Sequence, residues 1–203
     1  LYTDPGDLES DYSLALSLGA SISNNSIGSN VAQNGYPCAW QGDYGITAGT
    51  IDNVIRGSLG DPITVFWAAG NERGSGRCGT SDGTTAPPGN NKNAISIGAL
   101  NSNDDSMTGF SSWGPSDDGR LRPVLSAPGC QTGSDGGVTS TGDASNTEYI
   151  TLCGTSMAAP TAAGIGALIL QDFRAQYPEL GDPSNQLMKV ILIEGAEDIL
   201  NTG

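Results

Sequence analysis

Histidine is absent from the sequence, and positively charged residues are few. The 203 residues include no histidine and only eight Lys and Arg against 22 Asp and Glu, so the net charge is −14. This charge argues against nucleic acid or an anionic membrane as a partner. Without histidine, most transition-metal sites lose their commonest ligand, and a reactive serine loses its usual general base.

Long hydrophobic runs and paired cysteine motifs are also missing. No stretch approaches transmembrane length, and no signal peptide is recognisable. The four cysteines form no C-x-x-C pair, which argues against a zinc knuckle or a thioredoxin-like site. Two disulfides in an exported protein are the favoured interpretation. The sequence does not fix their pairing, but Cys38–Cys78 and Cys130–Cys153 are favoured because each pair brackets one loop-rich insertion; a reactive Cys153 is the alternative.

Strand-like and helix-like segments alternate along the chain, and the 30 glycines favour a turn-rich protein over a helical bundle. This alternation predicts one α/β domain over residues 1–203, with three layers and helices on both faces of a mostly parallel sheet. The helix over 157–176 is apolar on nearly every side and is expected to be buried. Residues 133–146 are expected to form an exposed loop. Strands are expected over 20–26, 63–69, 94–100 and 124–127, the last stopped by Pro128 and Gly129, and helices over 11–18, 45–56, 157–176 and 182–193.

Ser156 lies in a run of small residues, Gly154-Thr155-Ser156-Met157-Ala158-Ala159-Pro160, that is typical of a helix start. Pro160 suits a first helical turn, where a missing N–H costs nothing. A hydroxyl at this point faces unpaired backbone N–H groups and the positive end of the helix dipole. The pattern therefore indicates a nucleophile beside an oxyanion site; an ordinary helix-capping serine is the alternative.

Several stretches taken together resemble the subtilisin-like serine proteases, or subtilases. The Ser156 segment is similar to the nucleophile motif of that family, and Ala68-Ala69-Gly70-Asn71-Glu72 to the segment that completes its oxyanion hole. The resemblance covers about residues 11 to 199 in family order. The remaining matching stretches are Asn25-Ser26-Ile27-Gly28-Ser29, Phe110-Ser111-Ser112-Trp113-Gly114-Pro115 and Arg122-Pro123-Val124-Leu125-Ser126-Ala127-Pro128-Gly129.

The resemblance implies a serine endopeptidase that forms an acyl-enzyme on Ser156, with the Asn71 side chain in the oxyanion hole. It places Thr85-Ala86 near a pocket floor, where the absence of charge predicts an apolar or broad preference for the substrate residue. It also implies a cis bond between Pro87 and Pro88. The substrate-binding residues that it implies are Ser26, Ile27, Gly28, Ala68, Ala69, Gly70 and Thr155.

The family triad also needs an Asp and a His, which normally lie upstream of the matched region. We therefore expect the C-terminal part of a catalytic domain, incomplete at its N-terminal side and close to inert alone. The His and its Asp would lie on a missing segment or a separate chain, which would then be a partner alongside the protein or peptide substrate. A non-catalytic peptide-binding module is the alternative. An α/β-hydrolase is disfavoured because Gly154-Thr155-Ser156-Met157-Ala158 is not G-x-S-x-G.

No cofactor is expected for catalysis. The acidic composition is compatible with a secreted hydrolase, and the two favoured disulfides also indicate an exported, extracellular protein. The resemblance makes structural calcium plausible, because members of the family commonly bind it and the acidic loops offer oxygen ligands. A solvated acidic surface explains the same residues, so none is assigned to a metal. The candidate residues are Asp104, Asp105, Asp117, Asp118, Asp135 and Asp143.

Overall fold

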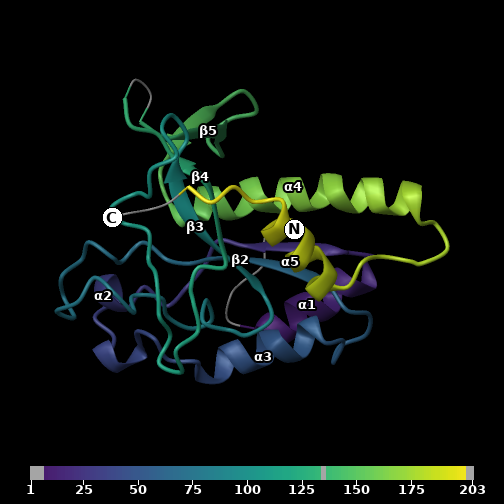
Figure 1. Ribbon diagram of the computed structural model, residues 1–203, viewed down its shortest axis with the longest axis horizontal. Helices are drawn as coiled ribbons and strands as arrows, with labels where there is room; N and C mark the ends of the chain where they lie inside the picture. The colour runs from purple at the N-terminus through teal and green to yellow at the C-terminus, as the bar shows by residue number, and fades with distance from the viewer. Residues whose placement is uncertain (1–6, 134–135, 200–203) are drawn as a thin grey trace.

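The computed structural model describes residues 7–133 and 136–199, which form a parallel sheet with helices on both faces (Figure 1). Asp135, one of the calcium candidates, lies outside the described residues. The elements in chain order are α1 (Leu8–Ser17), β1 (Ile22–Asn25), α2 (Val31–Asn34), the 3-10 helix η1 (Cys38–Trp40), α3 (Gly45–Ile55), β2 (Thr64–Ala68), β3 (Ile95–Asn101), β4 (Leu125–Cys130), β5 (Val138–Thr141), β6 (Tyr149–Leu152), α4 (Thr155–Gln176) and α5 (Asn185–Glu194).

The main sheet has four parallel strands in the order β1-β2-β3-β4, the same as their order in the chain. Parallel neighbours need a crossover each time, and these crossovers carry helices or long loops. The register pairs Asn25 with Trp67 and Ala68 with Ile97. The carboxyl ends of β1 and β2 therefore lie side by side, and the segments that follow them meet at one edge of the sheet.

Side chains of β2 alternate between two hydrophobic layers. Phe66 and Ala68 pack with α4 and Met188 of α5 on one face. Val65 and Trp67 pack with α1 and α3 on the other. This alternation follows from the two-residue period of a strand. All five residues of β2 are buried, as expected for a central parallel strand. The predicted three-layer α/β fold is confirmed.

Helix α4 lies along the sheet and is buried on one side only, which corrects the expectation that it is buried all round. Ile165 and Leu168 keep 47% and 66% of their surface exposed. The buried side is made mostly of small residues, which let the helix approach the sheet closely. A Cβ on Gly166 would lie 2.6 Å from Cζ of the fully buried Phe66, so a larger residue would require Phe66 to shift.

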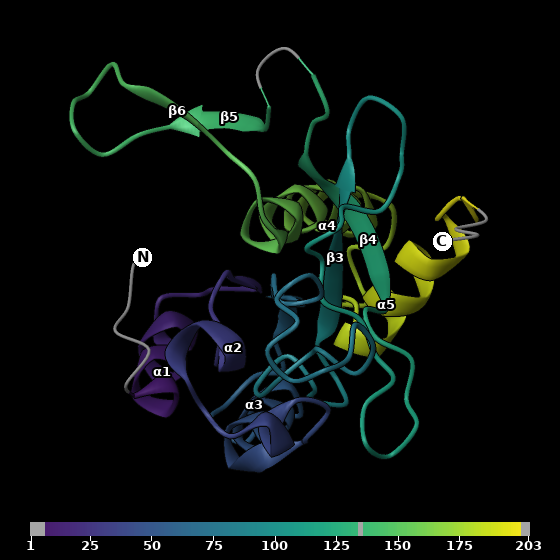
Figure 2. The ribbon, with the colours of Figure 1, turned by 90° about the vertical axis from the view of Figure 1, so that its left-hand side faces the viewer.

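Two predictions about residues 124–152 are wrong. Strand β4 continues through Pro128 and Gly129 to Cys130. Because β4 is an edge strand, the missing N–H of Pro128 removes no bond that the sheet requires. The segment expected to be a loop contains β5, which pairs with β6 in an antiparallel hairpin that projects away from the sheet (Figure 2). Three of the four residues of β5, Val138, Thr139 and Thr141, are β-branched and have a strand propensity that the Gly- and Asp-rich flanks conceal.

Helix boundaries also differ at several places. Helix α5 begins at Asn185, capped by the Ser184 hydroxyl that accepts from Leu187 N at 3.2 Å, instead of beginning at Asp182 and Pro183. Helix α4 begins at Thr155, so Pro160 lies in its second turn and not in its first. The short elements α2 and η1 were not expected from the sequence.

Both favoured disulfides, Cys38–Cys78 and Cys130–Cys153, are present. The expected cis bond between Pro87 and Pro88 is confirmed, and two further X-Pro bonds, at Pro115 and Pro123, are also cis.

Candidate active site

Ser156 is the second residue of α4 and is half-buried. Its hydroxyl donates to the carbonyl oxygen of Ser26 at 3.4 Å, and the Ser26 hydroxyl donates to the Ser156 carbonyl at 2.9 Å. Ser26 follows the last residue of β1. These two hydrogen bonds join the start of α4 to the carboxyl end of β1, across 130 residues of sequence.

The Ser156 carbonyl is free to accept from Ser26 because of Pro160. In a regular helix the N–H of residue 160 would donate to the carbonyl of residue 156. Proline has no N–H, so this helical bond is missing. The proline therefore leaves the Ser156 carbonyl without a helical donor, and the bond from Ser26 to this carbonyl joins β1 to α4.

Asn71 is held in one orientation by Thr155. Its Oδ1 accepts from the Thr155 backbone N–H at 2.9 Å and from the Thr155 hydroxyl at 3.0 Å. The same hydroxyl accepts from Gly70 N at 3.1 Å. Because Oδ1 carries both bonds, the Asn71 amide nitrogen is the end that remains available to a ligand.

The side-chain nitrogen of Asn71 and the backbone nitrogen of Ser156 lie near the same point beside Gly154. A Cβ built on Gly154 would lie 3.4 Å from Asn71 Nδ2, 3.6 Å from Ser156 N and 3.6 Å from Met157 Sδ. Two nitrogen donors therefore border one position at the start of α4. Such a pair, fixed on rigid elements, can stabilise an oxyanion.

The start of α4 is fixed against the end of β4. Gly154 N donates to Gly129 O at 2.9 Å. A Cβ on Gly129 would lie 2.6 Å from Gly154 O and 2.9 Å from Ala158 Cβ, so no larger residue fits. The disulfide between Cys130 and Cys153 joins the residues next to this contact. Ser156 is thus positioned from two strands, β1 and β4.

The predicted substrate-binding segments lie together. Gly28 and the Ala68-Ala69-Gly70 segment line one small cavity with Ser29, Asn30, Thr84 and Ala86. Ser26 and Ile27 are exposed at the same end of β1. Thr155 is fully buried behind Asn71, so its side chain acts on the site by positioning Asn71. Thr85 is fully buried as well, while its neighbour Ala86 lines the cavity.

Glu72 is a site residue to which sequence analysis gave no role. It lines the same cavity and is only 5% exposed. Its position directly after Asn71 was the available signal, but a single acidic residue after a strand is usually solvated. Its Oε1 accepts hydrogen bonds from the backbone N–H groups of residues 32 and 33, which are remote in sequence.

A second, wider cavity is lined by Ser156 itself. It measures about 440 Å³ and is bordered by the β5-β6 hairpin and the first turns of α4. Ser156, Met157 and Pro160 contribute from the helix, and Val138, Ile150 and Leu152 are among the contributors from the hairpin. Because the hairpin was expected to be a loop, this side of the site was not predicted.

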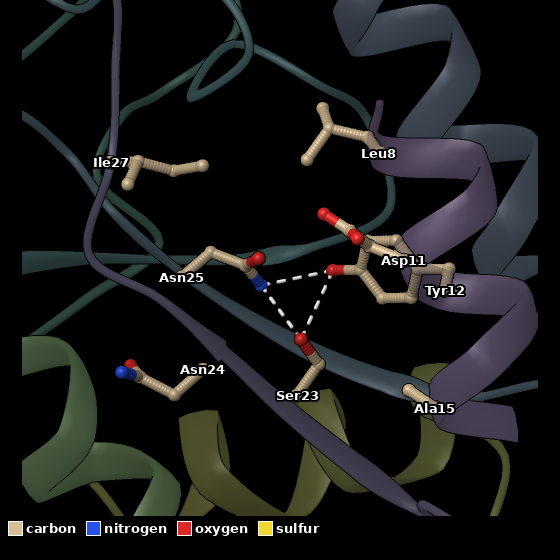
Figure 3. Close-up of a pocket in the computed structure, with 8 residues that line it drawn as sticks. All are labelled: Leu8, Asp11, Tyr12, Ala15, Ser23, Asn24, Asn25 and Ile27. Atoms are coloured by element: carbon tan, nitrogen blue, oxygen red, sulfur yellow. Dashed lines mark hydrogen bonds between the residues drawn. The ribbon is translucent and has the colours of Figure 1, made fainter. Parts of the chain in front are cut away.

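A third cavity, of about 100 Å³, lies between α1 and β1 (Figure 3). Asn25 Nδ2 donates to the Tyr12 hydroxyl and to Ser23 Oγ, both at 2.9 Å, and the two hydroxyls are 3.1 Å apart. Burial raises the pKa of Tyr12 despite these hydrogen bonds. Asp11 Oδ2 is buried there and has no hydrogen-bond partner within the described residues. The cavity between α1 and β1 is therefore lined by several polar side chains, including Tyr12, Asn25 and Asp11.

No general base contacts the Ser156 hydroxyl within residues 7–133 and 136–199, where its hydrogen bond goes to the Ser26 carbonyl. A carbonyl oxygen accepts a hydrogen bond but does not take the proton. The described residues also contain no group of three or more His, Cys, Asp or Glu that could hold a metal. Asp118, one of the calcium candidates, pairs with Arg120 at 2.8 Å. No helix in the described part is long and apolar enough to cross a membrane.

Comparison with known proteins agrees with this geometry. The model of the Subtilase family matches residues 5–200. Serine protease AprX of Bacillus subtilis is 38% identical over 140 residues, which are 63% of this chain and 29% of AprX. C5a peptidase of Streptococcus pyogenes is 37% identical over 92 residues, 44% of this chain and 7% of that protein.

Among solved structures, the prenylagaramide maturation protease PagA superimposes with a TM-score of 0.67 at 21% identity. The match covers 97% of this chain and 59% of PagA, and at this identity it shows the fold alone. The match spans less than a third of the length of the two curated relatives, AprX and C5a peptidase. The family model nevertheless covers nearly all of the chain, and the chain belongs to the subtilase family.

Proposed function

We propose that this chain carries the nucleophile, the oxyanion hole and part of the substrate cleft of a serine endopeptidase. The observation that carries the proposal is the position beside Gly154, which is bordered by both Asn71 Nδ2 and Ser156 N. Family membership makes a peptide bond the natural target. Ser26 to Gly28 and Ala68 to Gly70 would bind the substrate as strand edges, by backbone hydrogen bonds.

The reaction that these groups support is acyl transfer. Ser156 Oγ attacks the peptide carbonyl carbon and loses its proton to a base, while the carbonyl oxygen becomes an oxyanion held by Asn71 Nδ2 and Ser156 N. Collapse of this intermediate expels the amine, which takes up the proton, and leaves an acyl group on Ser156. Water then hydrolyses the acyl-enzyme and frees the serine.

We propose that the base comes from outside these 203 residues, which include no histidine. We propose that a segment carrying a His and its Asp, on the same protein or a separate chain, completes the site. The 203-residue chain alone would then be nearly inert, because triad members act as a unit and single removals cost roughly 10⁴–10⁶ in rate. We further propose that this segment stabilises the parallel sheet.

Secretion and structural calcium are also proposals. The two disulfides support an oxidising compartment, which fits an exported protease. Acidic loop residues such as Asp104 and Asp143 could contribute oxygen ligands to calcium.

Serine-directed labelling of the mature protein tests the function. A fluorophosphonate should label Ser156 when the His-bearing segment is present, as located by peptide mass analysis, and Ser156→Ala should abolish the label. The same label should be much slower on the 203-residue chain alone. Rapid labelling and casein cleavage by the isolated chain would refute the proposed need for an outside base. Intact mass and N-terminal sequencing would identify the completing segment.

The second candidate is a peptide-binding module without catalysis. The hydrogen bond of the Ser156 hydroxyl to a carbonyl, with no base beside it, favours this candidate. It predicts peptide binding by the mature protein with no labelling of Ser156 under any condition. The mass of a single polypeptide with no His-bearing segment would support it.

A further inference from the structure

The β5-β6 hairpin is weakly anchored to the rest of the molecule. Among the described strands, β5 and β6 pair only with each other. All of their residues are exposed except Val138, which is half-buried. The hairpin projects away from the main sheet (Figure 2). Because an isolated two-stranded hairpin is only marginally stable in water, its position beside α4 depends on the segments that join it to the rest of the chain.

The Cys130–Cys153 disulfide closes the base of this hairpin. Cys130 is the last residue of β4 and Cys153 directly follows β6, so the bond encloses both β5 and β6. Next to the disulfide, Gly154 N donates to Gly129 O at 2.9 Å. The disulfide and this hydrogen bond together hold the chain that returns from the hairpin against the end of β4.

The residues that follow Cys153 carry groups that the proposed reaction uses. Thr155 N donates to Asn71 Oδ1 at 2.9 Å, and Ser156 contributes both its hydroxyl and its backbone N–H. The hairpin also borders the cavity of about 440 Å³ that Ser156 lines. Only two residues separate Cys153 from Ser156, so any freedom of the chain at Cys153 is transmitted to the nucleophile and to the donor beside it.

A soluble thiol can reach the disulfide, because Cys153 is exposed while Cys130 is half-buried. Thiol–disulfide exchange begins when a thiolate attacks one sulfur, so the rate depends on this access. The second disulfide, Cys38–Cys78, also joins one exposed and one half-buried cysteine. It links η1 to the loop between β2 and β3 and encloses neither the hairpin nor α4, which makes it a matched control.

We propose that the Cys130–Cys153 disulfide is a redox switch for the proposed active site, which is competent only when this bond is formed. A dithiol reductant opens the bond by giving it two electrons and two protons and becomes a cyclic disulfide itself; a disulfide oxidant reverses the exchange. In the reduced form the start of α4 loses its covalent tie to the end of β4. A chain made in a reducing compartment therefore stays inactive and gains competence where disulfides form. This inference rests on the proposed function and adds its regulation.

Labelling of Ser156 under controlled redox conditions tests the inference. The mature protein carrying Cys38→Ser and Cys78→Ser is equilibrated at increasing ratios of reduced to oxidised dithiothreitol and labelled with a fluorophosphonate. The labelling rate should fall by roughly 10- to 100-fold on reduction, the larger figure corresponding to the constraint that a disulfide places on a loop of this size. Oxidised dithiothreitol should restore it. The variant with Cys130→Ser and Cys153→Ser should label slowly at every ratio.

Hydrogen exchange read by mass spectrometry separates a switch from a purely structural disulfide. Reduction of the unaltered protein should speed exchange in the hairpin and in residues 153–158, while β1 to β3 stay protected. If exchange rises in all strands together, the disulfide only stabilises the fold and the inference is wrong. Unchanged exchange in residues 153–158 would also overturn it, and this measurement needs no variant to fold.

The labelling outcomes distinguish the inference from the function on which it rests. If the oxidised and the reduced protein are labelled at the same rate, the redox switch is refuted while the proposed function stands. If the oxidised, unaltered protein is not labelled at all, the proposed function fails and the switch fails with it.

Discussion

The substitution Thr155→Val isolates the hydroxyl that positions Asn71. Valine keeps the shape of threonine but removes the group that donates to Asn71 Oδ1 and accepts from Gly70 N. Gly70 N–H then loses its acceptor at a half-buried position. An unpaired backbone donor costs about 1–3 kcal/mol, and the lower part of that range, about 1–2 kcal/mol, suits partial exposure. For a chain of this size the melting temperature should fall by roughly 2–8 °C.

The same substitution should slow catalysis, but only in part. Asn71 Oδ1 keeps its 2.9 Å bond from the Thr155 backbone, so the amide is less firmly oriented and not released. The fall in kcat of the mature protease should therefore stay below the roughly 10²–10³ expected when an oxyanion donor is absent.

Thermal unfolding and peptide hydrolysis, measured on the same preparations, check both parts, with Thr155→Ser as the matched control. Serine keeps the hydroxyl and loses a buried methyl, so its melting temperature should fall while kcat is retained. If Thr155→Ser lowers kcat as much as Thr155→Val, packing and not the hydroxyl orients Asn71, and the reasoning is wrong.

Three further predictions concern separate groups. Asn71→Ala should lower kcat by about 10²–10³ with little change in KM, a magnitude established on a member of this family; an unchanged kcat in steady-state hydrolysis would remove Asn71 from the oxyanion hole. Replacing Cys130 and Cys153 together by Ser should reduce the unfolding free energy by about 3 kcal/mol in urea titrations, as for a loop of some two dozen residues, and no loss would contradict this. Burial lowers the pKa of Lys189 from 10.5 to about 8. Between these two pH values the unfolded chain binds more protons at this residue than the folded chain does, so the free energy of unfolding rises with pH. Between pH 8 and 10.5 the wild type should gain stability relative to Lys189→Met, and a constant difference would refute this.

The layered fold was predictable because its strongest signals are local. The run from Ile63 to Ala69 is apolar and rich in strand-forming residues, and it lies where β2 was expected. The hairpin of β5 and β6 was missed because strand pairing there depends on contacts that no single short segment displays. Similarly, the extension of β4 through Pro128 depends on its place at the sheet edge, which is a tertiary property.

The site divides along the same line. Ser156 and Asn71 could be named as candidates from sequence because each lies in a motif at an element boundary. The hydrogen bonds of Thr155 to Asn71 and of Glu72 to Ala32 could not be predicted, since the partners are 84 and 40 residues apart. Pro160 illustrates both cases: its presence near the helix start was plain, but its effect on the Ser156 carbonyl required the helix to begin at Thr155.

The bonds between Ser26 and Ser156 have a consequence for the order of folding. They close a loop of 130 residues, and the Asn71 to Thr155 bonds close one of 84. Contacts so distant in sequence form late, because the chain must lose the entropy of closing a long loop before the contacts can stabilise it. During synthesis, β1 and β2 emerge well before α4 does. A nascent chain therefore exposes the carboxyl ends of β1 and β2 before residue 156 has been added, and the bonds between Ser26 and Ser156 can form only after α4 has docked.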